Sequence, residues 1–387
     1  WQRGGRKTTG CSGKGVARGR SQLQLGSLLV GGPVVYRMSY VPRGRGGRSG
    51  GGFRGGGRGA RGGRGASWTS VGPQTGGRGA SHNAKVNLLA TLTGHTKTVS
   101  SLACSLKRQQ LFSGSADGSI RIWGWPDGNF GQQGALETGL PVNSLMVEDD
   151  WLVAGIGQTG QPNIIRIWNM ESNATQDLPG HDGPVYVIVQ GNGMLFSAGH
   201  DAGIRCWKMD PATMQFGLVG VLQGHTAAVQ NVQVAGTTLY SCARDNTIKV
   251  WDLSTGQGVT SVTTVHTEFM MGLRLYDVYL FSAGLDGKVV VYDTTKNLQH
   301  VFTHTVTNRD RAPSPVTAVE IATDSAGKAL LIVSCSDNAI KLWEVPNFER
   351  RGILLGHTQP CRALCPGPGN SIFSAGMDQS IKVWEFE

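Results

Sequence analysis

Acidic residues are missing from the first 116 positions of this 387-residue sequence, in which the first Asp or Glu is Asp117. Residues 1–80 hold 2 Lys and 13 Arg, giving a charge of +15, whereas the remainder holds 21 basic and 26 acidic residues, giving −5. Residues 1–80 also contain 26 of the 58 glycines. So few apolar side chains cannot offset the entropy lost on ordering. We therefore expect residues 1–80 to be a disordered, basic Gly/Arg-rich arm and residues 81–387 to fold.

Long apolar runs and clustered cysteines are also lacking. No run reaches the roughly 18 residues that a membrane-spanning helix needs. The seven cysteines are scattered, which indicates buried, reduced thiols in a protein of the nucleus or cytoplasm. The sequence begins at Trp1, and residues 1–37 weakly resemble a transit peptide. We favour the alternative that they are upstream sequence and that the protein starts at Met38.

A repeated pattern of about 40–45 residues fills the folded part. Copies such as "LFSGSADGSIRIW", "LYSCARDNTIKVW" and "IFSAGMDQSIKVW" each end in an aromatic residue, and a Gly-His or a lone His precedes most of them. Short runs of β-branched and aromatic residues alternate with turns, which predicts four strands in each copy. The seven anchor residues are Trp123, Trp168, Trp207, Trp251, Tyr292, Trp343 and Trp384.

These markers resemble the WD-repeat family over residues 86–387. The resemblance implies an all-β fold, a seven-bladed WD40 β-propeller preceded by the arm. The segment "VNLLATL" (86–92) has no repeat before it, and we expect it to close the ring by pairing with the last copy.

The resemblance also implies a hydrogen-bonded set in each good blade, which runs from a turn Asp through His and Ser to the Trp ring. It carries over to four sets: His95, Ser113, Asp117 and Trp123; His181, Ser197, Asp201 and Trp207; His225, Ser241, Asp245 and Trp251; His357, Ser374, Asp378 and Trp384. A Ser, a His and an Asp invite a catalytic interpretation, but this trio recurs blade after blade, as no active site does.

The glycine-rich stretch "GIGQTG" (155–160) fits the spacing of a dinucleotide-binding motif, but it precedes a strand and not a helix, which favours a hairpin over a dinucleotide site. We expect no enzyme activity, no metal site and no cofactor.

Two longer stretches, "DDWLVAGI" (149–156) and "IKLWEVPNFERRGILLGH" (340–357), resemble the plant CCCH zinc-finger WD-repeat proteins. A CCCH finger needs three Cys and one His at short spacing, and no cysteine lies between Cys11 and Cys104. The finger is therefore absent from this chain, through loss or through a gap in the gene model. Many propellers that serve ubiquitin ligases carry Trp-Asp-x-Arg after the third strand, and none of the seven copies has that Arg.

The arm has the composition of an RNA-binding RGG segment. Arginine pairs with phosphate and stacks on bases, and aromatic side chains stack as well. The candidate RNA-binding residues are Arg43, Arg45, Arg48, Phe53, Arg54, Arg58, Arg61 and Arg64.

The propeller face that carries the loops before the first strand and after the second is where the family binds protein partners. The resemblance places seven candidate residues there: Tyr186, His200, Arg244, Met271, Leu285, Arg362 and Met377. The sequence thus predicts an RNA-associated adaptor, with RNA on the arm and protein on the ring. It leaves the oligomeric state unknown, and a monomer is taken by default. The alternative is a protein-only scaffold, such as a ubiquitin-ligase substrate receptor, whose arm is incidental.

Overall fold

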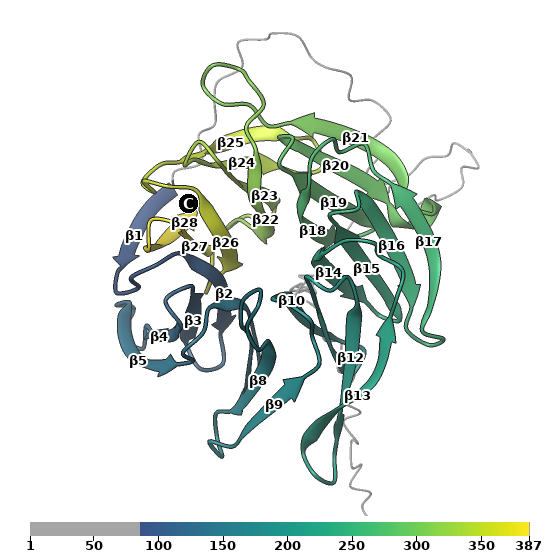
Figure 1. The fold of residues 1–387 in the computed structure, drawn as a ribbon. Helices are drawn as coiled ribbons and strands as arrows, with labels where there is room; N and C mark the ends of the chain where they lie inside the picture. Colours follow the sequence, from purple (N-terminus) through teal and green to yellow (C-terminus); the bar gives the residue numbers. More distant parts are fainter. Residues whose placement is uncertain (1–85, 387) are drawn as a thin grey trace, which may run out of the picture.

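The computed structural model describes residues 86–386, so the arm and residues 81–85 lie outside the described part. The described chain forms seven four-stranded antiparallel sheets, arranged as the blades of a ring (Figure 1). This confirms the predicted fold class. The first strand of each blade lies nearest the centre, and the fourth lies at the rim.

The blades follow one another along the chain. Blade 1 consists of β2 (Val99–Ser105), β3 (Gln110–Ser115), β4 (Ser119–Gly124) and β5 (Gly131–Glu137). Blade 2 consists of β6 (Val142–Glu148), β7 (Trp151–Ile156), β8 (Ile164–Asn169) and β9 (Thr175–Pro179). Blade 3 consists of β10 (Val185–Gly191), β11 (Met194–Gly199), β12 (Ile204–Asp210) and β13 (Gln215–Leu222). Blade 4 consists of β14 (Val229–Ala235), β15 (Thr238–Ala243), β16 (Thr247–Asp252) and β17 (Gln257–Thr263).

The remaining blades include one short helix and one strand from the beginning of the described chain. Blade 5 consists of β18 (Met270–Tyr276), β19 (Tyr279–Gly284), β20 (Lys288–Asp293), the 3-10 helix η2 (Thr294–Lys296) and β21 (Gln299–Thr305). Blade 6 consists of β22 (Val316–Thr323), β23 (Ala329–Cys335), β24 (Ile340–Glu344) and β25 (Glu349–Leu354). Blade 7 consists of β26 (Cys361–Pro366), β27 (Ser371–Gly376), β28 (Ile381–Phe386) and β1 (Val86–Leu92).

The two ends of the described chain meet in blade 7. The strand β1 pairs antiparallel with β28, from Val86 opposite Phe386 to Leu92 opposite Ile381. The Lys382 ammonium also donates to Thr91 Oγ1 at 3.2 Å. This pairing covers the edge of β28, which would otherwise be open to another chain.

The hydrophobic core is divided among the blade interfaces. Residues on the two faces of each sheet alternate, and each face packs on a neighbouring blade. Between blades 5 and 6, for example, Phe281 and Val291 pack with Leu331, Val333 and Trp343. Six further clusters fill the other interfaces of residues 86–386. Because every blade is held on both sides, the ring is a rigid support for the loops at its ends.

A candidate protein-interaction face

A β-bulge occurs at the same place in all seven innermost strands. In β10, Val185 pairs with Gly199 but Val187 pairs with Ala198, so Tyr186 is left out of the ladder. The equivalent shift appears in β2, β6, β14, β18, β22 and β26. Such a bulge re-aims one side chain. We call the seven skipped residues the bulge ring: Ser100, Asn143, Tyr186, Gln230, Met271, Thr317 and Arg362.

A second set lies next to the first, at the turn after each second strand. In blade 3, the amide of His200 donates to the carbonyl of Pro184, just before β10, at 3.0 Å. The same amide-to-carbonyl bond, at 2.9 or 3.0 Å, ties the two loops together in every blade. We call its donors the turn ring: Ala116, Gly157, His200, Arg244, Leu285, Ser336 and Met377.

In these turns, the residue after the Asp has a left-handed backbone conformation, with a positive φ. In blade 1, Gly118 follows the turn Asp with φ of +84°, and in blade 4 Asn246 does so with φ of +58°. Glycine and asparagine tolerate this conformation better than other residues. The turn Asp caps the same turn, since the Asp245 carboxylate accepts from the amide of Thr247 at 2.9 Å. The repeated short turn sets the direction of the residue that precedes the Asp.

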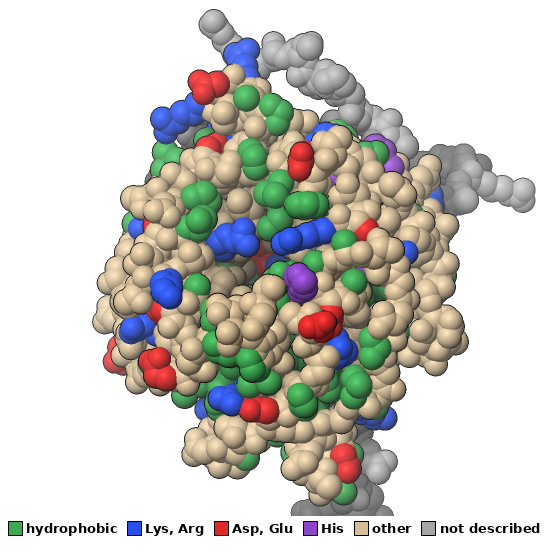
Figure 2. All heavy atoms as spheres, in the orientation of Figure 1, with side chains coloured by type: hydrophobic (Ala, Val, Ile, Leu, Met, Phe, Trp, Pro, Cys, Tyr) green, Lys and Arg blue, Asp and Glu red, His purple; other side chains and the backbone are tan. Residues whose placement is uncertain are grey.

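The structure brings all seven candidate residues of the protein-binding face into these two rings. Tyr186, Met271 and Arg362 belong to the bulge ring. His200, Arg244, Leu285 and Met377 belong to the turn ring. The fourteen ring residues include two arginines and no Asp or Glu. In the view down the ring, Lys or Arg side chains border the hollow at its centre, beside one His and several hydrophobic side chains (Figure 2). We call the two rings together the central face.

Arg244 is held between two aromatic rings from neighbouring blades. Its guanidinium carbon lies 5.7 Å from the centroid of the Tyr186 ring and 5.4 Å from that of Phe269. These distances are those of cation–π contacts. Phe269 stands directly before β18 and is 43% exposed. It is not among the seven residues that the sequence predicted for the protein-binding face. The sequence could have indicated Phe269 only as an aromatic residue just before the first strand of blade 5, in "HTEFMM".

Arg362 shares this environment. Its side chain is accessible to solvent, but neighbouring protein atoms partly desolvate the guanidinium. This desolvation lowers the pKa of the Arg362 guanidinium, and the charge of Arg244 lowers it further. The two arginines therefore repel each other on the central face.

Farther along the innermost strands, a bidentate ion pair joins blades 5 and 6. Arg274 Nε lies 2.8 Å from Glu320 Oε1, and Arg274 Nη2 lies 2.9 Å from Glu320 Oε2. Burial acts to lower the pKa of Arg274, but the attraction of Glu320 raises it above its usual range. Both charges are thus neutralised within the protein.

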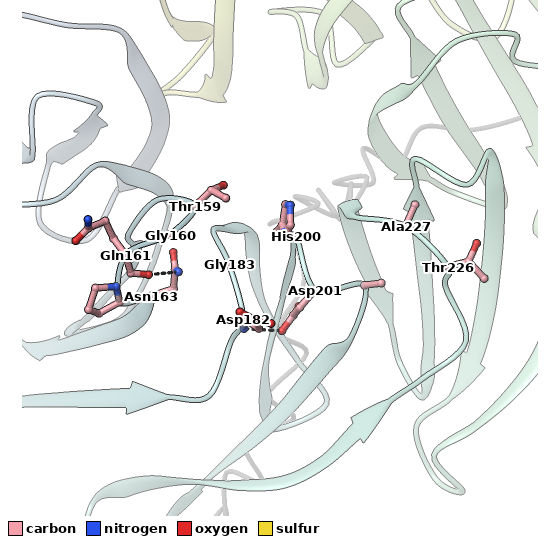
Figure 3. A pocket seen from close by; sticks show the side chains of 12 residues that line it. Thr159, Gly160, Gln161, Asn163, Asp182, Gly183, His200, Asp201, Thr226 and Ala227 are labelled. Atoms are coloured by element: carbon pink, nitrogen blue, oxygen red, sulfur yellow. Dashed lines mark hydrogen bonds between the residues drawn. The ribbon is translucent and has the colours of Figure 1, made fainter.

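A hollow with a volume of about 640 Å³ includes His200 of the turn ring in its lining and so adjoins the central face. His200 stands between the glycine-rich loop at Thr159–Asn163 and the loop of Thr226 and Ala227 (Figure 3). The Asp182 amide donates to Asp201 Oδ2 at 3.1 Å. The Asp201 carboxylate also accepts from Arg205 and contacts His181. The Asp201 carboxylate thus bonds inside blade 3, with His181 and Arg205, as part of the structural set of that blade.

The four predicted His-Ser-Asp-Trp sets are each joined by hydrogen bonds. In blade 4, His225 Nδ1 lies 2.8 Å from Asp245 Oδ2, and His225 Nε2 lies 2.8 Å from Ser241 Oγ. Trp251 Nε1 donates to the same Ser241 Oγ at 2.8 Å. In the sets of blades 1, 3 and 7, the corresponding distances to the nearer oxygen lie between 2.7 and 3.0 Å. These residues brace the blades from inside.

Burial controls the protonation of these sets. It lowers the pKa values of His95, His181, His225 and His357, so these rings are neutral at pH 7. Burial acts to raise the pKa of Asp117, but hydrogen bonds from Ser119, Thr96 and His95 bring it down to about 2.

Three blades depart from the full set. In blade 5, His266 Nε2 keeps its 2.8 Å contact with Ser282 Oγ, and the buried Tyr292 replaces the tryptophan. At the register position of the serine, blade 2 has Ala154 and blade 6 has Val333.

Other functional classes find little support in residues 86–386. No group of three or more His, Cys, Asp or Glu there could hold a metal ion. The cysteines of this part are free, and burial raises the pKa of Cys242 to about 12 and that of Cys206 to about 11. No helix in this range is long and apolar enough to cross a membrane. The eight candidate RNA-binding residues, Arg43 to Arg64, lie outside the described residues.

Comparisons with known proteins agree with this architecture. A family model described as "WD domain, G-beta repeat" matches residues 86–124, 216–252 and 348–385. The "Zinc finger CCCH domain-containing protein 48" of Arabidopsis thaliana is 34% identical over 301 residues, covering 78% of this chain and 67% of that protein. The "Zinc finger CCCH domain-containing protein 17" of Oryza sativa subsp. japonica is 30% identical over 303 residues, covering 78% and 66%.

A shorter match has a different name. The "Nuclear distribution protein PAC1" of Lachancea thermotolerans is 34% identical over 115 residues, which is 25% of each chain. The chain spans about two thirds of the length of the two CCCH-domain relatives described above.

Proposed function

The chain belongs to the WD-repeat family, together with plant zinc finger CCCH domain-containing proteins, and from this premise we propose that it is a non-enzymatic scaffold that holds a protein partner on its central face. One observation carries the proposal: the central face exposes Arg244 and Met377 on a rigid ring, with the half-buried Tyr186 and the exposed Phe269 beside Arg244. Aromatic, arginine and methionine side chains are those enriched in protein interfaces. Met377 is 44% exposed and Phe269 is 43% exposed, so both are open to a partner.

The proposal predicts that small apolar truncations on the central face remove partners. The full chain carrying Met271→Ala, Leu285→Ala and Met377→Ala is compared with the wild type as bait in an extract of the source cells. Truncating an anchor side chain costs about 1–2 kcal/mol of binding. Proteins retained by the wild type are therefore expected to be depleted about tenfold or more on this variant, as measured by quantitative mass spectrometry.

The matched control removes exposed apolar side chains from the outer strands. Leu89→Ala, Leu218→Ala and Val259→Ala lie on β1, β13 and β17, and their side chains are 47%, 52% and 63% exposed. This variant is expected to retain the same proteins as the wild type. Equal capture by all three baits would show that partners do not use the central face.

We further propose that the basic arm contacts RNA, which makes the protein an RNA-associated adaptor. The support is compositional: residues 1–80 carry a charge of +15, no acidic residue, and arginines interleaved with glycine and Phe53. Arginine fits both phosphate and base stacking, and a chain without acids releases counterions on binding RNA.

The arm proposal predicts a loss of salt-dependent RNA affinity when its arginines are neutralised. The variant carries Gln at positions 43, 45, 48, 54, 58, 61 and 64 of the full chain. Fluorescence anisotropy with a uridine oligonucleotide at several salt concentrations gives the slope of log affinity against log salt. This slope is expected to fall by about 0.7 for each arginine that contacts phosphate. Unchanged affinity and slope would instead favour the protein-only scaffold.

A further inference from the structure

Neither of the two arginines of the central face has an acidic partner within residues 86–386, in contrast to five arginines elsewhere in the ring that do. Arg166, Arg205, Arg274 and Arg351 each lie within 3.0 Å of a carboxylate oxygen. For Arg244 and Arg362, no carboxylate of residues 86–386 lies within ion-pair distance. No other ring residue supplies one, because the rings contain no Asp or Glu. Neither guanidinium of the central face is therefore neutralised by an ion pair within the described residues.

Arg244 is oriented by groups that leave its donors free. Tyr186 and Phe269 contact the guanidinium through their rings. A planar guanidinium that stacks on aromatic groups still presents its N–H groups at its edge, where a carboxylate can accept two of them. Arg244 is therefore held ready for an anionic acceptor before any partner arrives, which lowers the entropy cost of binding.

Arg362, from the opposite side of the ring, adds to the same positive field. Its charge and that of Arg244 disfavour each other, and Arg362 stands in a partly desolvated position. A bound anion relieves this repulsion. It also gains more from the interaction beside a partly desolvated guanidinium than on a fully hydrated surface, because less water screens the charges.

The apolar ring residues indicate which kind of anionic molecule fits. Met271, Leu285 and Met377 stand in the same two rings as the arginines. Methionine adapts its shape to apolar peptide side chains. The Tyr186 and Phe269 rings each have one face occupied by the Arg244 guanidinium. A peptide that combines acidic and apolar side chains can pair with the arginines and also pack against the apolar ring residues.

The charge of this chain's own arm argues against the arm as occupant. Residues 1–80 carry only basic ionised side chains, which the two arginines repel. The occupant is thus expected to come from another molecule.

We propose that the central face binds an acidic peptide segment of a partner protein, in which Asp or Glu side chains flank an apolar one. The carboxylates pair with Arg244 and Arg362, and the apolar side chain packs against Met271, Leu285 or Met377. This inference rests on the proposed scaffold function, because it specifies what the scaffold recognises.

The test uses the full chain and a fluorescent peptide of Asp and Glu residues with two leucines in the middle. A peptide with Asn and Gln in place of the acids is the matched neutral probe. The acidic peptide is expected to bind the wild type about tenfold or more tightly than the neutral one. The double variant Arg244→Gln with Arg362→Gln is expected to lose about tenfold or more of its affinity for the acidic peptide. The variant Arg244→Lys with Arg362→Lys keeps the charges but not the planar guanidinium groups. Its affinity for the acidic peptide is expected to lie between that of the wild type and that of the Gln variant.

A second double variant controls for total charge. Lys208→Gln with Arg350→Gln also removes two positive charges, from exposed positions on β12 and β25. The arm is the same in all variants, so its own attraction for acidic peptides cancels in the comparison. Equal weakening by the two double variants, or equal binding of acidic and neutral peptides, would overturn the proposal. So would an Arg244/Arg362 effect on binding of a uridine oligonucleotide but not of the peptide.

The outcome is separable from that of the scaffold proposal. If the apolar triple variant at positions 271, 285 and 377 loses cellular partners while the Arg244→Gln/Arg362→Gln variant keeps them, the scaffold stands and the acidic-peptide inference fails. If neither variant loses partners, the scaffold proposal itself fails.

Discussion

Replacing Glu320 with alanine is expected to destabilise the protein by about 3 kcal/mol, because the substitution leaves a buried guanidinium without its counter-charge. Glu320 is the bidentate partner of Arg274, at 2.8 and 2.9 Å. The two side chains are only 10% and 20% exposed, so water cannot replace the lost carboxylate fully. A lower midpoint of urea unfolding, followed by circular dichroism, measures the effect.

The double variant Arg274→Met with Glu320→Leu distinguishes the contribution of the ion pair to stability from the cost of leaving one buried charge unpaired. Removing both charges also removes their desolvation cost, so this variant is expected to be within about 1 kcal/mol of the wild type. A large loss in both variants would mean that the ion pair itself holds blades 5 and 6 together. A negligible loss in Glu320→Ala would mean that Arg274 finds other acceptors; its Nη1 already donates to the carbonyl of Leu273 at 2.7 Å.

This ion pair illustrates what the sequence could not predict. The repeats predicted seven blades because all seven copies end in an aromatic anchor and most carry the same turn, such as Trp251 and Asp245 of blade 4. Arg274 and Glu320 are 46 residues apart and lie on different blades, and no other blade repeats them. A periodic pattern reports what the blades have in common, so contacts specific to one interface stay hidden.

The same reasoning applies to the candidate site. Tyr186 and Arg244 could be named from their position in the repeat, since a bulge recurs in every blade and a short turn recurs in every blade except blade 2. Phe269 could not, because only one blade has an exposed aromatic residue at that place and its contact with Arg244 crosses a blade boundary.

His304 shows how a marker can mislead. In the sequence it is the lone His that precedes the anchor Trp343, in the place where other copies have the His of a bonded set. In the structure it lies on β21 of blade 5, where its ring centroid is 4.9 Å from that of Trp343. Burial lowers its pKa to about 4, and Val333 takes the place of a bonding serine. The 51 residues between Tyr292 and Trp343 include the extra loop that precedes β22, which breaks the usual spacing.

Replacing Ser241 with alanine is expected to have the second large effect, a loss of about 2–4 kcal/mol, because one missing hydroxyl leaves two buried groups without partners. Ser241 Oγ accepts from Trp251 Nε1 and contacts His225 Nε2, both at 2.8 Å. The side chains of Ser241, His225 and Trp251 are all buried, so water does not substitute for the hydroxyl. The expected observation is a drop in the urea midpoint with an unchanged slope, since the folded and unfolded states keep their compactness.

Two control variants show whether the loss of stability comes from the missing hydrogen bonds or from removing any serine hydroxyl. Ser254→Ala removes an exposed turn hydroxyl that donates to Asp252, and it is expected to change stability by less than about 0.5 kcal/mol. Ala154→Ser adds a hydroxyl at the equivalent position of blade 2, which lacks the histidine, so it should stabilise nothing and instead bury an unpaired group. If Ser241→Ala costs no more than Ser254→Ala, the His-Ser-Trp chain does not hold the blade together. Packing of Trp251 with the core between blades 3 and 4 then has to account for its stability.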